Sequence, residues 1–446
     1  MTQKKVAVLG LGITGLATVN YLVTEGYSVT VFDTRDNPPS EDKLTADVIL
    51  IKGKLCGETL SLFPLIISSP GIALATPALQ FAINAGSEVI GDIELFARKL
   101  KTSAYQHAKC VTITGSNGKS TVTDLLGEVA VESGCKVAVG GNIGIPALEL
   151  LSPEVELYIL ELSSFQLETT RSLNADIATI LNVSEDHLDR YNSYQHYTET
   201  KHLIYQQAKV ALYNSEDSLT TPQNTSKASL SFGFDNAIYH IKQSAAKNYL
   251  CKGEEQLLDV QQLKLSGKHN WLNALATLAL GDAVNLKMSA MLSTLRRYTG
   301  LEHRCEFVAE SSGVRWINDS KATNIGATQA ALQGLSETIS GDVHLILGGE
   351  GKGANFNELA PFLTQVKGKI CCFGADADKI KAATARAEIV LDLQAAIKKI
   401  SSQTTTGDLV ILSPACASLD MYPNFMARGD HFKTLVNKLV AGEANE

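Results

Sequence analysis

Short runs of β-branched residues alternate with longer amphipathic stretches along the whole chain. The first series is KVAVL, SVTVF, DVILI and PLIISS, with a helix expected from Thr14 to Glu25 between the first two runs. Such alternation is typical of a parallel sheet with crossover helices. The pattern restarts with KCVTITG, ELYILEL and IATILNV, and begins a third time with VRWINDS, VHLILGG, KICCFG and DLVILSP. The sequence therefore predicts an α/β protein built from three units.

The chain length agrees with three units, because 446 residues correspond to about three domains of roughly 150 residues each. Each boundary is expected where a helical stretch precedes a new series of strands. The predicted domains are residues 1–96, 97–299 and 300–446. Residues 214–266 are polar and weakly periodic, so we expect irregular strands and loops there, attached to the middle domain.

Composition and charge limit the kind of partner. Hydrophobic residues make up 45% and charged residues 19% of the chain, as in soluble globular proteins. The net charge of −8 favours neither a nucleic-acid nor a membrane partner, so we expect small-molecule ligands. A monomer is the default expectation. Eight cysteines without a C-x-x-C pair indicate a reducing compartment. The apolar N-terminal run is interrupted by glycines and is not interpreted as a signal peptide, so we expect a cytoplasmic protein.

The first glycine-rich turn directly follows the first predicted strand. Residues Gly10 to Gly15 satisfy G-x-G-x-x-G, and Asp33 ends the second strand. Glycines let a diphosphate approach backbone N–H groups at a helix N-terminus, and the acid can bind a ribose or a base. This pattern predicts a Rossmann-like N-terminal domain, and a tight turn without a ligand remains the alternative.

The second glycine-rich turn, TGSNGKST, occupies residues Thr114 to Thr121 between a strand and a helix. Successive backbone amides can surround phosphates, Lys119 supplies a positive charge, and Ser120 can reach a phosphate-bound Mg²⁺. The loop departs from G-x-x-x-x-G-K-S/T because Ile113 stands at the first glycine position. We therefore predict a P-loop ATPase-like central domain with a variant loop, rather than a motor or a GTPase.

Polar bursts follow two further strands of the central series. ELSSFQ begins at Glu161, and SEDHLDRY contains Asp186 and His187. Because parallel strands end at one edge of the sheet, these side chains are expected near the P-loop. A carboxylate beside the P-loop hydroxyl suits Mg²⁺, although Glu161 and Asp186 could instead cap helices. Lys201 lies in the helical stretch TETKHLIYQQAK, and its residue type alone predicts a solvated charge.

The chain resembles the Mur ligase family over essentially its whole length. After the P-loop variant the motifs that carry the resemblance are GGNIG (140–144), ELSSFQ (161–166), NVSEDHLDRY (182–191) and GKHNWLNALA (267–276). The similarity is greatest to family members that use D-glutamate, as judged from the first glycine motif with Asp33-Thr34-Arg35 and from DSKATN (319–324), LGGEGKG (347–353) and SPACASLD (413–420). The resemblance implies a UDP-binding Rossmann-like domain, a central ATP-binding domain and a Rossmann-like C-terminal domain that binds the amino acid.

The activity that the resemblance implies is ATP-dependent addition of D-glutamate to UDP-N-acetylmuramoyl-L-alanine in peptidoglycan precursor synthesis. The alanyl carboxylate would attack the γ-phosphate of ATP to give an acyl phosphate and ADP, and the amine of D-glutamate would then displace phosphate. Lys119 and metal ions would offset charge on the phosphoryl oxygens. His187 is a candidate base for the amine and also a candidate metal ligand, and both roles stay open.

Carried over position by position, the resemblance implies three sets of binding residues. ATP would contact Gly115, Asn117, Gly118, Lys119, Ser120, Thr121, Asn270, Asn273, Arg304 and Asp319. The UDP substrate would contact Ile13, Thr14, Asp33, Thr34, Arg35, Gly71, Asn142 and Ser163. D-Glutamate would contact Thr323, Lys352, Ser418, Leu419 and Phe425.

The resemblance also implies two Mg²⁺ sites and a modified lysine. Ser120 and Glu161 would hold the first ion, and His187 and Lys201 would attend the second. Lys201 would be carboxylated on its amine by CO₂, which turns a cation into an oxygen-bearing anion that suits Mg²⁺. Lys119, His187 and Lys201 would be the catalytic residues. The segment before Lys201 is one residue shorter than the family pattern, so this assignment depends on the register of the helix.

Three other functions are weighed against this interpretation. A folate ligase or another amide ligase of the superfamily is the nearest alternative, but folate ligases resemble only the last two domains. An NAD-dependent oxidoreductase would explain the first glycine motif and leave Lys119 to Thr121 without a role. A non-catalytic nucleotide-dependent scaffold would not need the full set of metal and phosphate residues.

Overall fold

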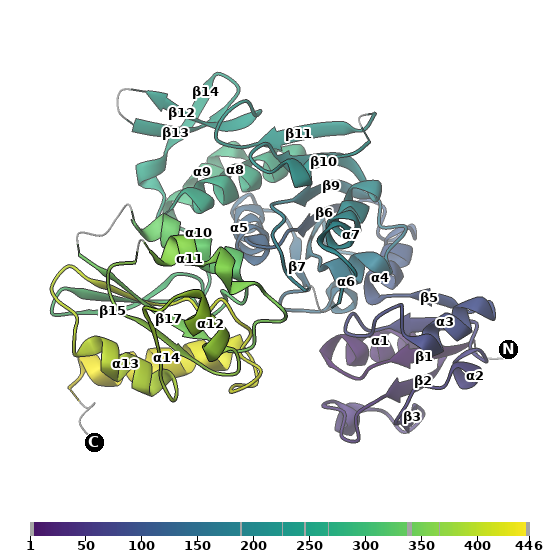
Figure 1. Ribbon diagram of the computed structural model, residues 1–446. Helices are drawn as coiled ribbons and strands as arrows, with labels where there is room; N and C mark the ends of the chain where they lie inside the picture. The colour runs from purple at the N-terminus through teal and green to yellow at the C-terminus, as the bar shows by residue number, and fades with distance from the viewer. Residues whose placement is uncertain are drawn as a thin grey trace.

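Three β-sheets follow one another along the chain, each within its own α/β unit (Figure 1). The computed structural model describes residues 4–187, 190–224, 226–244, 247–265, 267–336, 341–364 and 366–442, with the backbone alone at 334–336. The predicted α/β architecture with three units is confirmed. Within these ranges no helix is both long and apolar enough to cross a membrane.

The first unit is a five-stranded parallel sheet with the order β3-β2-β1-β4-β5. Alternate residues of β1 enter different cores, with Val6 and Val8 on one face and Ala7 and Leu9 on the other. The strand is continuously apolar because helices cover both faces. The strands are β1 (Lys5–Leu9), β2 (Ser28–Asp33), β3 (Ile49–Lys52), β4 (Leu65–Ser68) and β5 (Glu88–Ile90), and the helices are α1 (Ile13–Thr24), η1 (Glu41–Lys43), α2 (Gly57–Leu60), α3 (Pro77–Asn84) and α4 (Asp92–Leu100).

The central unit contains a nine-stranded sheet with the order β14-β13-β12-β11-β10-β9-β6-β8-β7. Strands β6 to β12 pair in parallel, and β13 and β14 extend the sheet antiparallel. Residues 214–266, expected to be irregular, supply β11 to β14 and so form an ordered edge of this sheet. The strands are β6 (Lys109–Thr114), β7 (Val137–Gly141), β8 (Leu157–Glu161), β9 (Ala175–Ile180), β10 (Ala208–Asn214), β11 (Ala228–Phe232), β12 (Tyr239–Ser244), β13 (Lys247–Lys252) and β14 (Glu255–Asp259).

The helices of the central unit cover both faces of its sheet. Val122, Leu275 and Met291 of α5, α8 and α9 pack in one core, and Tyr197 of α7 packs in the core on the other face. Parallel strands require such cover because both of their faces are apolar. The helices are α5 (Lys119–Glu132), η2 (Ala147–Leu150), α6 (Ser164–Glu168), α7 (Tyr194–Gln206), η3 (Ser218–Thr220), η4 (Val260–Gln262), α8 (Lys268–Ala283) and α9 (Met288–Arg297).

The third unit is a six-stranded sheet with the order β15-β16-β20-β17-β18-β19. Only β15 is antiparallel to its neighbour, and the other pairs are parallel. The strands are β15 (Glu306–Ser311), β16 (Val314–Asn318), β17 (Val343–Gly348), β18 (Ile370–Phe373), β19 (Ala387–Ile389) and β20 (Leu409–Leu412). The helices are α10 (Ile325–Ser336), η5 (Phe356–Glu358), α11 (Ala360–Leu363), α12 (Ala377–Ala383), α13 (Leu393–Ser401) and α14 (Phe425–Val440).

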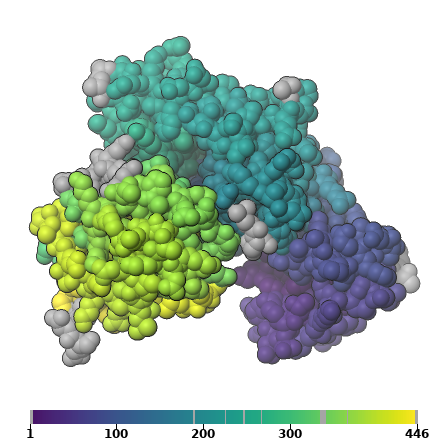
Figure 2. Space-filling view, in the orientation of Figure 1, coloured from purple at the N-terminus to yellow at the C-terminus, as the bar shows by residue number. Residues whose placement is uncertain are grey.

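The units are joined in two different ways. One apolar core spans the first and central units, and within it the rings of Phe96 and Tyr158 meet edge to face with centroids 5.1 Å apart. The two described cores of the third unit contain no residue of the other units. In the space-filling view a hollow separates the first unit from the third (Figure 2). Polar side chains therefore make the principal described links between the third unit and the central one.

Candidate active site

The second glycine-rich turn joins β6 to α5 and forms the centre of the candidate site. Gly118 has a φ of +82°, and an added Cβ would lie 2.7 Å from Asn273 Oδ1. Glycine is required because a side chain here would be strained and would displace Asn273. Helix α5 begins at the next residue, Lys119, so its positive N-terminal end points at the turn.

Lys119 lies folded over its own loop. Its Nζ donates hydrogen bonds to the carbonyl oxygens of Gly115 and Ser116, at 2.7 and 2.9 Å. Burial lowers the pKa of Lys119, and the carboxylates of Glu161 and Asp186 oppose that shift. The lysine thus places a positive charge inside the loop that the sequence predicts to surround phosphates.

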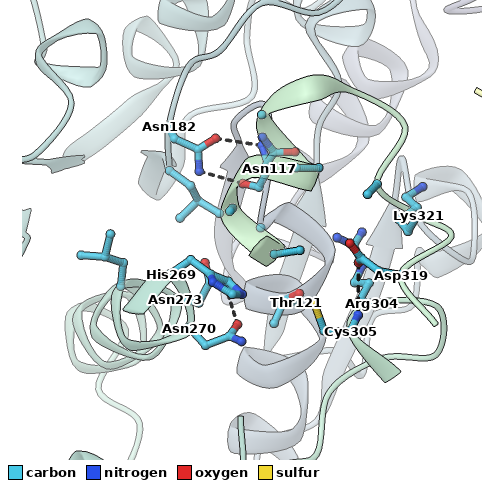
Figure 3. A pocket seen from close by; sticks show the side chains of 18 of the residues that line it. Asn117, Thr121, Asn182, His269, Asn270, Asn273, Arg304, Cys305, Asp319 and Lys321 are labelled. Carbon is cyan, nitrogen blue, oxygen red and sulfur yellow. Dashed lines mark hydrogen bonds between the residues drawn. The ribbon is translucent and has the colours of Figure 1, made fainter. Parts of the chain in front are cut away.

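A cavity of about 340 Å³ opens beside the turn, between the central and third units (Figure 3). It brings together seven of the ten residues predicted to contact ATP, which are Asn117, Gly118, Thr121, Asn270, Asn273, Arg304 and Asp319. The other three belong to the same turn but do not line this cavity. His269 and Lys321 also line it, although they were not predicted. Both lie inside motifs of the resemblance, GKHNWLNALA and DSKATN, so the signal that could have found them was present.

Arg304 and Asp319 are among the residues of the third unit that line this cavity. Arg304 is half-buried and donates from a terminal guanidinium nitrogen to Ser120 Oγ over 2.6 Å. Asp319 accepts from the Ser413 hydroxyl at 2.7 Å and from the Cys305 backbone at 3.1 Å. Burial raises the pKa of Asp319 to about 7. The third unit therefore contributes directly to the P-loop site in this conformation.

Glu161 ends β8 and faces the P-loop. Its Oε1 accepts from Asn142 Nδ2 at 2.8 Å, and its buried Oε2 has no hydrogen-bond partner among the described residues. Burial alone would raise the pKa of Glu161, but Lys119, Ser120 and Asn142 hold it below the usual value. An ionised carboxylate with a free oxygen beside a hydroxyl fits the ligands that Mg²⁺ prefers.

His187 and Lys201 lie on the other side of the turn. The ring of His187 meets Phe165 edge to face at a centroid distance of 4.9 Å, and burial lowers the pKa of His187 to about 4. Lys201 Nζ donates to Gly115 O at 3.0 Å and lies 4.5 Å from the centroid of the Tyr197 ring. Burial, with the nearby charge of Lys119, holds the pKa of Lys201 well below its usual value.

The expectation that Lys201, judged by residue type alone, is a solvated charge is wrong. The residue is 2% exposed, because α7 packs its face against the sheet instead of presenting it to solvent. No cluster of three or more His, Cys, Asp or Glu side chains with metal-binding geometry exists in the part of the chain that the structure describes. A second metal site at His187 and Lys201 would therefore need oxygen ligands from elsewhere.

A cleft of about 480 Å³ lies beside the first glycine-rich turn. It brings together seven of the eight residues predicted for the UDP substrate, which are Ile13, Thr14, Asp33, Thr34, Arg35, Gly71 and Asn142. Ser163 does not line it. The Ser163 hydroxyl instead forms a capping box with Gln166 at the start of α6, and Gln166 lines the cleft in its place.

Asp33 holds the walls of this cleft. Its carboxylate accepts from the backbone of Leu11 at 2.7 Å and from the Arg35 side chain at 2.7 and 2.9 Å. These bonds with Arg35, together with the backbone bonds, lower the pKa of Asp33 to about 2. The carboxylate is therefore ionised at neutral pH, and its described bonds fix the loop that carries Thr34 and Arg35.

The cavities described for this structure do not bring together the residues predicted to bind D-glutamate. Lys352 lines a small cavity with His187, and its Nζ forms an ion pair with Asp186 at 2.7 Å. The ring of Phe425 lies 3.9 Å from the Nζ of Lys321, and Leu419 is 67% exposed. Two of the loops that carry these predicted residues, those of Lys352 and Ser418, nevertheless meet, since Glu350 and Ala417 exchange two backbone hydrogen bonds at 2.8 and 3.0 Å.

Three family models match successive parts of the chain. They describe a Mur ligase MurD-like N-terminal domain at residues 4–91, a Mur ligase middle domain at 113–281 and a Mur ligase glutamate ligase domain at 303–416. Among solved structures, a pseudomurein peptide ligase type C from Methanothermus fervidus covers 98% of this chain and 100% of its own with 17% identity and a TM-score of 0.63. The UDP-N-acetylmuramate-alanine ligase of Thermotoga maritima covers 98% and 99% with 19% identity and the same TM-score. These two structures show the shared fold.

Curated relatives are similar over nearly the whole chain. Proteins named UDP-N-acetylmuramoylalanine--D-glutamate ligase from Shigella boydii and from Escherichia coli strain K12 are each 48% identical over 439 residues, which cover 98% of this chain and 98% of theirs. The protein of that name from Salmonella typhi is 48% identical over 442 residues, covering 98% and 99%. Because the family models and the full-length relatives agree with the fold and with the clustered motifs, this chain belongs to the Mur ligase family.

Proposed function

We propose that this protein is an ATP-dependent amide ligase that joins D-glutamate to UDP-N-acetylmuramoyl-L-alanine, giving ADP and phosphate, in peptidoglycan precursor synthesis. The observation that carries the proposal is the contact of Arg304 with Ser120 at 2.6 Å. It brings the third unit, which matches a glutamate ligase domain, to the P-loop of the central unit. The name and the full-length coverage of the 48% identical relatives support the same activity.

The residues around the P-loop can carry the first step. Lys119 and Arg304 supply two positive charges that stabilise the phosphoryl oxygens and reduce repulsion of the incoming carboxylate. Ser120 and Glu161 would hold Mg²⁺, because they offer a hydroxyl and an ionised carboxylate with a free oxygen. When bound, Mg²⁺ neutralises phosphate charge. Asn142 lines the cleft assigned to the UDP substrate and also donates a hydrogen bond to Glu161, which faces the P-loop. The chain itself would therefore position the alanyl carboxylate where the cleft meets the P-loop.

The second metal site and the modified lysine are a finer part of the proposal. CO₂ reacts with a neutral amine. Burial and the nearby charge of Lys119 lower the pKa of Lys201, so its amine is neutral at a lower pH than usual. The nitrogen forms a bond to the carbon of CO₂ and loses a proton, which gives a carbamate with two oxygens. The neutral imidazole of His187 would complete the site. Incubation with ¹³C-bicarbonate should give a carbamate carbon signal that Lys201→Arg lacks.

We assign the three predicted sets of binding residues to ATP, to the UDP substrate and to D-glutamate. The cavity and the cleft support the first two sets, and Gln166, His269 and Lys321 are added to them because they line the same spaces. The third set is supported by the meeting of its loops. We further propose a cytoplasmic monomer that acts on small molecules, without a nucleic-acid or membrane partner.

The competing functions are disfavoured by particular findings. A match of residues 4–91 to a MurD-like N-terminal domain opposes a folate ligase, and membership of the ligase family opposes an NAD-dependent oxidoreductase. The decisive test is phosphate release from ATP with UDP-N-acetylmuramoyl-L-alanine and each of D-glutamate, L-glutamate, L-lysine and meso-diaminopimelate. We expect release with D-glutamate alone. Release with another amino acid would keep the ligase chemistry and reject the acceptor, and no release with any of them would reject the UDP substrate.

A further inference from the structure

Arg428 is the largest fully buried side chain of the described structure, with 0% exposure. It lies in the first turn of α14, four residues after the helix cap Asn424. A buried guanidinium is costly unless its donors are satisfied. No carboxylate forms an ion pair with it among the residues described. The energetic cost of this burial indicates that the side chain has a role that a smaller apolar residue could not fill.

The donors of Arg428 are satisfied by three separate loops. Its Nε and one terminal nitrogen donate to Oγ and O of Ser320, at 3.0 and 2.8 Å. The terminal nitrogens also donate to the carbonyl oxygens of Gly348, Cys416 and Ala417 at 3.1 to 3.3 Å. These acceptors follow or end β16, β17 and β20, the adjacent strands of the third sheet. One side chain therefore links the carboxyl ends of three strands.

The same three loops carry the residues assigned to D-glutamate. Thr323 follows Ser320, Lys352 follows Gly348, and Ser418 follows Ala417 along the chain. The start of α14, which carries Phe425, is linked to the same loops, because the Ser320 hydroxyl donates to the carbonyl oxygen of Phe425 at 2.8 Å. We call these three loops the acceptor loops. Arg428 connects only the acceptor loops to one another, since it makes no described hydrogen bond to the central unit.

From this arrangement we propose that Arg428 is a positioning residue for the acceptor amino acid: its guanidinium holds three loops and the start of α14 at the spacing that binds D-glutamate. The inference rests on the proposed function and deepens it. The fork of five N–H donors suits this task, because an ammonium on the same stem cannot reach three loops at once. The charges of Asp420 and Asp319 act on that of Arg428, so the proposed role rests on the hydrogen bonds of the guanidinium to the loops.

The test compares Michaelis constants for the three substrates in wild-type protein and in Arg428→Lys and Arg428→Met. We expect the KM for D-glutamate to rise by roughly 10- to 100-fold, as small misplacements of binding groups do, and the KM values for ATP and for the UDP substrate to stay within about twofold. Arg428→Lys should be the milder variant because it keeps the charge. An equal rise in all three constants, or an unchanged KM for D-glutamate, would overturn the proposal.

Two further variants keep this test decisive. Arg386→Met is the matched control, because Arg386 also donates only to carbonyl oxygens, those of residues 363 and 366–368, but at the amino-terminal edge of the sheet. It should leave all three constants unchanged. If both Arg428 variants unfold, Ser320→Ala takes their place, and its KM for D-glutamate should rise more than its KM values for ATP and the UDP substrate. If wild-type protein uses another acceptor, the proposed function fails, and the KM of that acceptor still decides the role of Arg428.

Discussion

The carbonyl oxygen of Gly115 accepts hydrogen bonds from two lysines, Lys119 at 2.7 Å and Lys201 at 3.0 Å. Two ammonium groups on one buried oxygen repel each other, so each lowers the pKa of the other unless nearby carboxylates stabilise both charges. Glu161 and Asp186 provide that help to both lysines. The arrangement therefore favours one charged lysine, which we assign to Lys119, and one neutral lysine at position 201.

Lys119→Met should reduce the rate of D-glutamate-dependent phosphate release by about 10²- to 10³-fold, the usual effect of removing one preorganised charge at a transition state. The KM for D-glutamate should change little, because Lys119 lies at the P-loop. Lys209→Met is the control, since this exposed lysine pairs only with Asp176 among the described carboxylates. Phosphate release within twofold of wild type in Lys119→Met would contradict the assignment.

The buried carboxyl of Asp92 makes the stability of the fold depend on pH. It is 3% exposed at the start of α4, where its Oδ2 accepts from Gln166 at 3.3 Å and its Oδ1 has no described partner. Burial raises the pKa of Asp92 to about 6 from 3.8. Ionisation therefore opposes folding: the stability of the neutral form is fully present below pH 3.8 and is lost as the pH rises through 6.

The variant Asp92→Asn cannot ionise. Relative to wild type, its free energy of unfolding should increase by about 2 kcal/mol between pH 4 and pH 7, because a full unit of pKa shift corresponds to about 1.36 kcal/mol and part of the shift is already felt at pH 4. Chemical denaturation at several pH values measures this difference. The exposed Asp36→Asn serves as the control and should show no such trend. A difference between Asp92→Asn and wild type that is independent of pH would show that the carboxyl is not held neutral by burial.

At the scale of elements, the sequence predicts most where a strand is buried on both faces. KVAVL and the other apolar runs form strands because alternate residues enter two cores, as Val6 and Ala7 do. Strands β12 to β14, at one end of the sheet, were expected to be irregular because many of their side chains are polar and partly exposed, as in the pairing of Gln243 with Asn248. A strand that is half exposed carries only half of the apolar signal.

The first glycine-rich turn offers a matched pair of variants at this scale. A Cβ at Gly15 would lie 2.0 Å from the carbonyl oxygen of Gly10, whereas a Cβ at Gly12 would meet nothing within 4 Å. Gly15→Ala should therefore destabilise the first unit by about 1–3 kcal/mol, as overpacking does. Gly12→Ala should keep wild-type stability and weaken binding of the UDP substrate. Equal melting temperatures for the two variants would contradict this division of roles.

The site residues were predictable as motifs, but their contacts were not. Lys352 and Asp186 are 166 residues apart in the chain and belong to different units, so no local pattern indicates their ion pair. The burial of Lys201 likewise depends on how α7 packs against the sheet. Residue types and spacing predicted the P-loop and the acidic residues, and the family resemblance implied the acceptor loops. The tertiary fold determined which of these residues meet.

At the scale of the whole molecule, the third unit is held by few polar links. Asp186 accepts from Lys352 at 2.7 Å and from Asn324 at 3.1 Å, and Arg304 reaches Ser120. The third unit shares no described core with the other two units. Movement of the third unit as a body is therefore expected during the reaction cycle.

Lys352→Met should loosen this arrangement. The pair with Asp186 is largely buried, so loss of the lysine leaves a buried carboxylate without its principal partner. We expect a larger radius of gyration in small-angle scattering of the ligand-free protein. Lys242→Met removes an exposed pair with Glu254 and should leave the scattering unchanged. Identical scattering curves for Lys352→Met and wild type would show that the pair does not hold the unit.

Transfer of oxygen from the substrate carboxylate to phosphate distinguishes the proposed ligase reaction from hydrolysis of ATP by water. UDP-N-acetylmuramoyl-L-alanine labelled with ¹⁸O in its alanyl carboxylate is incubated with the protein, Mg²⁺, ATP and D-glutamate, and the phosphate released is analysed by mass spectrometry. Attack of the carboxylate on the γ-phosphate predicts one ¹⁸O atom in each phosphate, with a new amide to D-glutamate in the UDP product. Unlabelled phosphate would show that water attacks ATP and would contradict the assignment of this chain as the D-glutamate ligase.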